Sequence, residues 1–90
     1  MIFVYVRHEV ADYIKWRRHF DADLTRRKEG GATGIEYVYR DVENQNLVSI
    51  IMEWESMEKA RMFLADPLLK KITQDAGVIS EPEVHFLKSS

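Results

Sequence analysis

Two stretches of the chain alternate apolar side chains with the two-residue period of a β-strand: residues 2–8 (IFVYVRH) and residues 47–54 (LVSIIMEW). Both are rich in β-branched and aromatic residues, which favour strands. Each is followed, with almost no loop, by a stretch whose apolar residues recur every three or four positions, the spacing of one helix face. This strand-to-helix succession, found twice in one chain, most constrains the fold.

The first helical stretch is expected between residues 12 and 29. Asp12 is the predicted N-cap, because its carboxylate can accept the unpaired backbone N–H groups of the first turn. The apolar stripe consists of Tyr13, Trp16, Phe20 and Leu24. The sequence GGATG (30–34) should end the helix, since glycine adopts the left-handed closing conformation without a steric penalty.

The second half of the chain repeats the pattern with a hairpin in front. Residues 35–41 (IEYVYRD) and 47–54 are predicted strands joined by the polar turn VENQN. Ser56 should cap the helix that follows. Asp66 and Pro67 are predicted to begin another helix, so that the second helical stretch is split in two. Gly77 should end this last helix. Residues 83–88 (EVHFLK) form the predicted last strand.

The order β-α-β-β-α-β predicts an α+β, ferredoxin-like fold with a four-stranded antiparallel sheet. Right-handed crossovers place the helices on one face of the sheet, with the strands at residues 2–8 and 47–54 in its centre. Ninety residues are enough for one domain, residues 1–90.

Strand periodicity assigns the side chains to two faces of this sheet. The set expected under the helices is Ile2, Val4, Val6, Val48, Ile50, Met52, Val84 and Phe86. The opposite set is Phe3, Tyr5, Arg7, Ser49, Ile51, Glu53, His85 and Leu87. That second set is too apolar to face water, because monomers rarely expose large apolar patches. We therefore expect a homodimer whose sheets pack face to face as a barrel.

Composition and charge exclude several classes of protein. The net charge of −2 disfavours a nucleic-acid partner. No apolar run reaches the ~20 residues that span a bilayer, and the N-terminus lacks the pattern of a signal peptide. We expect no membrane association and a cytoplasmic location. The chain has no cysteine, and its histidines lack metal-site spacing, so no metal site is predicted.

Three segments carry a resemblance to a known group of proteins: VRHEVADYIKWRRHFD, EWESMEKARMFLADP and GVISEPEVHFL. Through them the chain, from residue 2 to 88, resembles the dimeric α+β barrel superfamily. It is most similar to small members grouped with antibiotic-biosynthesis monooxygenases and stress-responsive α/β-barrel proteins. The resemblance implies the fold derived above and a range of functions. These include cofactor-free oxygenases of phenolic polyketides, haem-degrading enzymes, isomerases of small lactones, and proteins without a known reaction.

The resemblance also bears on individual residues. Trp54 matches the family tryptophan near the end of the third strand, which borders the substrate cavity in monooxygenase-type members. The helix after it, residues 57–65, has no histidine at the place where haem-degrading relatives carry one. The expected cofactor is therefore none. A second interpretation of Trp54 comes from the residues alone, as a core residue that fills the corner of the abrupt strand-to-helix turn.

The candidate site lies on the uncovered face. Its catalytic residues are Tyr5 as a hydrogen-bond donor, Arg7 as the partner of an anionic or phenolate oxygen, and His85 as general base. The substrate-binding candidates are Phe3, Ser49, Ile51, Glu53 and Trp54. The alternative is structural: Arg7 and Glu53 pair with each other or across the dimer, and His85 is an ordinary interface histidine.

Two hypotheses of function follow. The first is a cofactor-free enzyme, oxygenase-like or isomerase-like, acting on a small aromatic or carbonyl compound in a cavity between the two sheets. The second is a non-catalytic homodimer with a binding, structural or regulatory role.

Overall fold

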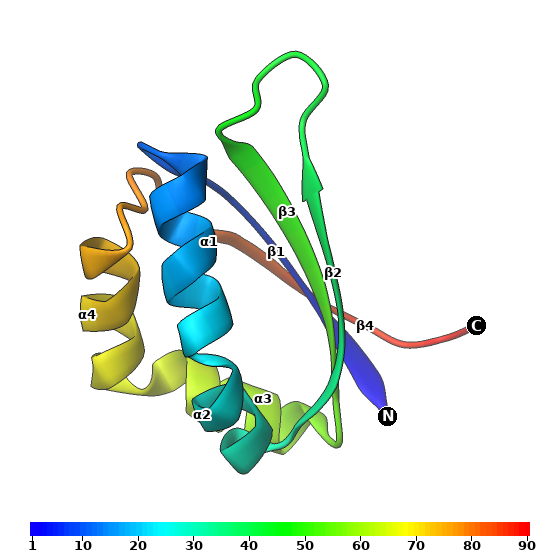
Figure 1. Ribbon diagram of the computed structural model, residues 1–90. Helices are drawn as coiled ribbons and strands as arrows, with labels where there is room; N and C mark the ends of the chain where they lie inside the picture. The colour runs from blue at the N-terminus through cyan, green and yellow to red at the C-terminus, as the bar shows by residue number, and fades with distance from the viewer.

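The computed structural model describes residues 1–90, and its elements follow the predicted order (Figure 1). The strands are β1 (Ile2–Glu9), β2 (Ala32–Arg40), β3 (Leu47–Trp54) and β4 (Glu83–Leu87). The helices come in two pairs, α1 (Tyr13–Ala22) with α2 (Leu24–Gly30), and α3 (Met57–Ala65) with α4 (Pro67–Asp75). None of the helices is long and apolar enough to cross a membrane.

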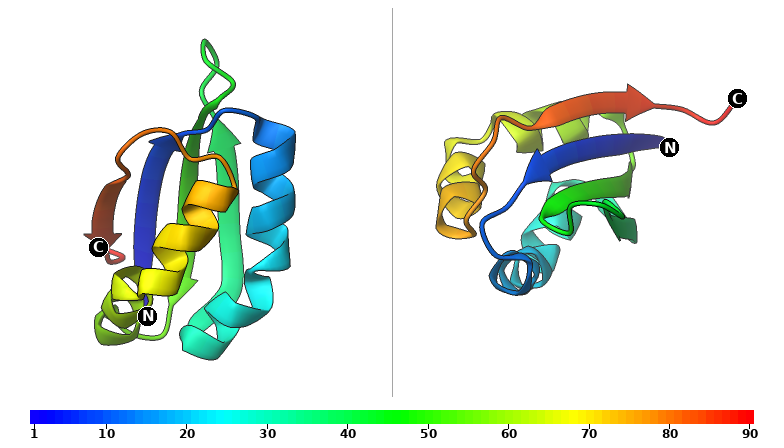
Figure 2. Two further views of the ribbon diagram at one scale, coloured as in Figure 1. Left: turned by 90° about the vertical axis from the view of Figure 1, so that its left-hand side faces the viewer. Right: turned by 90° about the horizontal axis from the view of Figure 1, so that it is seen from above.

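The strands form one antiparallel sheet in the order β2-β3-β1-β4, so that β1 and β3 are central as predicted. All helices lie on one side of the sheet, and the other side has no cover within the chain (Figure 1). Figure 2 shows α1 and α4 crossing the covered face, with strands visible between them. The predicted α+β ferredoxin-like fold is confirmed.

Helix starts follow the predicted capping residues. The carboxylate of Asp12 accepts a hydrogen bond from the backbone N–H of Lys15 at 3.3 Å, and Ser56 Oγ accepts from Lys59 N–H at 3.2 Å. Asp66 accepts from Leu68 N–H at 2.9 Å, and proline occupies the start of α4. Each side chain satisfies a donor that the first helical turn leaves free, which is why these positions were readable from local sequence.

The first helical stretch differs from the prediction because it breaks at Asp23 instead of running on to residue 29. In a continuous helix the carbonyl of Phe20 would accept from the N–H of Leu24. In the structure, Arg27 Nη1 donates to that carbonyl at 2.6 Å, and the N–H of Asp23 reaches it at 3.2 Å. The Phe20 carbonyl therefore does not make its helical hydrogen bond to Leu24, and the chain bends into α2.

Sheet periodicity sorts the side chains as predicted. The buried core consists of Val4, Val6, Val10, Trp16, Ala32, Val48, Ile50, Met52, Trp54, Ala60, Phe63 and Ala76. Val84 and Phe86 of the edge strand β4 pack against it and are half-buried. Its members in β1 and β3 all come from the face under the helices. One polar residue, His8, is buried on the same face.

Candidate functional site

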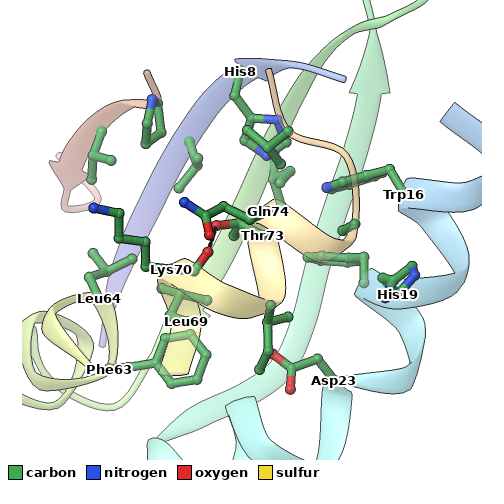
Figure 3. Close-up of a pocket in the computed structure, with 18 of the residues that line it drawn as sticks. His8, Trp16, His19, Asp23, Phe63, Leu64, Leu69, Lys70, Thr73 and Gln74 are labelled. Atoms are coloured by element: carbon green, nitrogen blue, oxygen red, sulfur yellow. Dashed lines mark hydrogen bonds between the residues drawn. The ribbon is translucent and has the colours of Figure 1, made fainter. Parts of the chain in front are cut away.

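A cavity of about 950 Å³ lies between the helices and the covered face of the sheet. Its floor is formed by β1 and β3, one wall by α1, and the other by α4 (Figure 3). It exists because α4 packs loosely: no residue of this helix is fully buried. Leu69 and Ile72 point part of their apolar surface into the cavity instead of sealing it.

The imidazole of His8, at the end of β1, is one of two buried polar groups that line this cavity; the other is Arg27. The side chain is only 6% exposed, and its Nδ1 is buried without a hydrogen-bond partner. Loss of solvation by burial lowers the pKa of His8 from its ordinary 6.5. A hydrogen bond with the backbone of His8 acts in the opposite direction but is the smaller effect. His8 is therefore neutral at pH 7, and it lines the cavity.

Aromatic side chains of α1 continue the wall from His8. The indole of Trp16 meets His8 edge to face, with ring centroids 5.5 Å apart. Phe20 stacks on Trp16 at 5.0 Å with the ring planes 21° apart. Trp16 and Phe20 stack on each other, in the offset arrangement that aromatic rings favour, and give the cavity an aromatic lining beside His8.

The far end of this wall is a buried ion pair. The guanidinium of Arg27 lies 3.8 Å over the Phe20 ring and donates to Glu36 Oε1 at 3.1 Å. Arg27 is 3% exposed and lines the cavity. Two atoms of the pair, Arg27 Nε and Glu36 Oε2, are buried without partners.

Polar residues of α4 face the aromatic wall across the cavity. Figure 3 shows Lys70, Thr73 and Gln74 on this side and His19 on the side of α1. Thr73 donates to the carbonyl of Lys70 at 2.9 Å, so its hydroxyl proton is already used. Nowhere in the chain do three or more His, Cys, Asp or Glu side chains come together as metal ligands.

None of the sequence-predicted site residues lines this cavity; all but Trp54 lie on the uncovered face of the sheet. Three of them come together there. Tyr5 pairs with His85 across β1 and β4, with ring centroids 5.9 Å apart, and its hydroxyl lies 3.4 Å from Ser49 Oγ. Phe3 and Ile51 lie beside them on the central strands, half-buried.

The structural alternative paired Arg7 with Glu53, and within the chain this pair does not form. Arg7 stands opposite Ser49, whereas Glu53 stands opposite Phe3, so the two charges are at different depths of the sheet. Arg7 lies 3.7 Å from Asp41. Glu53 accepts a hydrogen bond from Thr33 at 2.8 Å.

Trp54 takes the corner between β3 and α3. It is 1% exposed, its ring centroid lies 5.0 Å from that of Phe63, and it packs beside Gly30. The structure places it in the core, in agreement with the corner-filling interpretation.

Sequence reasoning missed His8 as a site residue, although a signal for it existed. The alternation that puts Val4 and Val6 under the helices puts His8 there as well, two positions further along the same strand. Arg27 carried a weaker signal. It belongs to a basic run, but it lies three positions after Leu24 and therefore continues the apolar stripe of this helical stretch.

Comparison with known proteins shows the fold. No protein-family model and no curated protein matches the sequence. Among solved structures, SnoaB, a cofactor-independent oxygenase from Streptomyces nogalater, is 15% identical with a TM-score of 0.78, over 99% of this chain and 92% of that one. An antibiotic biosynthesis monooxygenase is 9% identical with a TM-score of 0.73, over 100% and 99%. Rv0793 from Mycobacterium tuberculosis is 13% identical with a TM-score of 0.68, over 99% and 94%.

These likenesses cover essentially the whole chain and confirm the resemblance predicted from the sequence at the level of the fold. At such low identity they define an architecture, and the same architecture can support different functions.

Proposed function

We propose that this protein binds a small planar compound, aromatic or carbonyl-bearing, in the cavity between α1, α4 and the sheet, and that His8 removes a proton from it. The observation that carries the proposal is the position of His8, a buried imidazole on the cavity lining and directed into the cavity (Figure 3). Enclosed apolar cavities with few polar groups are the usual sites for small ligands.

Proton abstraction is the step that such a group performs well. A neutral imidazole accepts a proton from a hydroxyl, or from a carbon next to a carbonyl, and leaves a phenolate or enolate. Such an anion is the common starting point of isomerisation and of a reaction with dioxygen. SnoaB, with the same fold, is described as a cofactor-independent oxygenase, which supports a reaction of this kind.

Hydrogen–deuterium exchange tests the chemistry without an added oxidant. We expect the protein to bind 2-tetralone, a ketone fused to an aromatic ring, and to accelerate exchange of its α-protons in D₂O above the buffer rate. Replacement His8→Gln should abolish the acceleration. Arg18→Gln, a change at an exposed side chain of α1 outside the cavity lining, should preserve it. Both variants place the same polar, uncharged side chain at the substituted position.

The result also separates enzyme from binder. Ligand shifts at the Trp16 indole N–H, seen by NMR without any exchange, would favour a non-catalytic binding protein. His8 Nδ1 makes no hydrogen bond to a carboxylate that would orient the ring, an observation that favours this second candidate. Absence of both binding and exchange with 2-tetralone and 2-naphthol would refute the proposal.

We propose in addition that two copies pack through their uncovered sheet faces. Tyr37, Tyr39 and Leu87 expose 51%, 56% and 45% of their surface there. Burial of such side chains is worth about 25 cal/mol per Å². In this arrangement Tyr5, Arg7, Ser49, Glu53 and His85 would line the space between the sheets, where they remain candidates for a second polar site.

A further inference from the structure

Arg27 is a buried cation that uses only part of its hydrogen-bonding capacity. A guanidinium has five N–H donors. In the structure one nitrogen donates to the carbonyl of Phe20 and another to Glu36, and Nε has no partner. Glu36 likewise leaves Oε2 unpaired. Buried groups of this kind normally have their partners, so the deficit marks a position where a further polar group fits.

The ion pair is not explained by stability alone. Taking both charges out of water costs several kcal/mol for each ion, and well-packed apolar residues often replace such pairs without loss. Arg27 nevertheless lines the cavity wall, and three contacts hold it there. Phe20 stacks under the guanidinium and supplies the carbonyl oxygen, while β2 supplies Glu36.

Contacts connect Arg27 to His8 along one wall of the cavity. Arg27 lies on Phe20, Phe20 stacks on Trp16, and Trp16 meets His8. Figure 3 shows Trp16 and His8 directed into the space that faces α4. A ligand lying along this wall thus has the neutral base at one end and the guanidinium at the other.

From this geometry we infer that Arg27 is a specificity-determining residue, which selects ligands carrying a carboxylate on the end of the aromatic ring system remote from His8. The N–H groups left free by Phe20 and Glu36 donate to that carboxylate. Charge-assisted bonds from arginine to a carboxylate are short and strong, and their planar shapes match. This inference rests on the proposed function of the cavity and narrows it from planar compounds to planar aromatic acids.

Glu36 sets the strength of this selection. Its charge offsets that of Arg27, so a bound carboxylate feels an ion pair instead of a free cation. Removing the charge of Glu36 should therefore strengthen acid binding. An ion pair with a purely structural role gives no reason for such a gain.

The test compares two probes that differ only in charge at one group, 2-naphthoate and 2-naphthamide. Titration followed by NMR should show that the protein binds naphthoate about tenfold more tightly than the amide, as expected for a charge-assisted hydrogen bond. Glu36→Gln should raise this ratio several-fold. The double variant Arg27→Met with Glu36→Met should reduce it to about one.

The double variant is chosen because Arg27→Met alone would strand a buried carboxylate and endanger folding. Circular dichroism and thermal unfolding establish that it is folded. Lys70→Gln is the matched control, because Lys70 is another cation that lines the cavity but lies on α4. That variant should keep the wild-type ratio.

Three results would overturn the inference. Equal affinity of the wild type for acid and amide, with shifts at His8 and Trp16, would leave the ligand cavity standing and remove the role of Arg27. A ratio abolished by Lys70→Gln would assign the selection to α4. Failure of both probes to bind would overturn the inference together with the proposed function.

Discussion

The imidazole of His8 meets the indole of Trp16 edge to face, with ring centroids 5.5 Å apart and planes inclined at 68°. One ring belongs to the end of β1 and the other to α1, so the contact fixes the helix against the sheet at the place where the cavity begins. It also removes water from the histidine, which is the main cause of its lowered pKa. Packing and acid–base chemistry are therefore coupled in this pair.

The first prediction concerns the dependence of stability on pH. Because the pKa of His8 is lower in the folded protein than in the unfolded chain, the unfolded chain binds the proton more readily. The contribution of His8 to stability is complete above about pH 6.5 and is lost as pH falls through the lowered pKa. Urea unfolding between pH 8 and pH 5 should show a steeper loss of stability for the wild type than for His8→Gln.

The control for this experiment is Arg18→Gln, which alters an exposed side chain on the helix that carries Trp16. It should keep the wild-type slope. An identical slope for wild type and His8→Gln would contradict the assignment of His8 as a buried neutral base.

The second prediction separates a core role of Trp54 from a ligand-binding role. Its indole is almost fully buried against Phe63, so Trp54→Ala should lower the free energy of unfolding by about 3–5 kcal/mol. Trp54→Phe should cost less, because the indole Nε1 has no hydrogen bond to lose. Urea unfolding measures both. If Trp54→Phe keeps its stability but loses binding of 2-naphthol, the tryptophan belongs to the ligand site.

Much of the fold could be predicted because it follows from local rules. Asp12, Ser56 and Asp66 cap helices through contacts two or three residues away. The alternation in β1 and β3 states which side chains point toward the helices, and the structure agrees. The break at Asp23 was not predictable in this way. It depends on Arg27 taking the carbonyl of Phe20, and that contact is favoured by Glu36 on a distant strand.

The cavity depends on how far α4 lies from the sheet, and the local sequence does not encode this distance. The stripe of α4, with Leu69 and Ile72, reads as an ordinary apolar face, and nothing in it indicates that the helix packs loosely. On the uncovered face, the polar residues stand out in the sequence as exceptions to the apolar alternation of the strands. His8 was also such an exception, on the covered face, and strand parity alone would have placed it there.

The third prediction uses two glycines with left-handed backbone. Gly31 has φ of 122° and Gly77 has φ of 87°, and alanine at either position is strained by about 1 kcal/mol or more. A Cβ on Gly31 would also come within 2.8 Å of Lys59 Cδ and 3.0 Å of Lys59 Cβ, whereas at Gly77 the nearest atom is 3.9 Å away. Gly31→Ala should therefore destabilise the protein more than Gly77→Ala. Equal midpoints in thermal unfolding would show that Lys59 moves aside freely.

The last prediction tests whether the uncovered sheet face joins two copies of the chain. A carboxylate within such an interface is buried without a partner, which costs several kcal/mol and separates the copies. Light scattering coupled to size exclusion should show a dimer for the wild type and a monomer for Tyr37→Glu. Met62→Glu is the matched control, since Met62 is a 69% exposed apolar residue on α3, on the opposite side of the molecule. A wild type that is monomeric at micromolar concentration, or a dimer that Met62→Glu breaks and Tyr37→Glu does not, would place the interface elsewhere and leave the aromatic side chains of β2 as a surface for another partner.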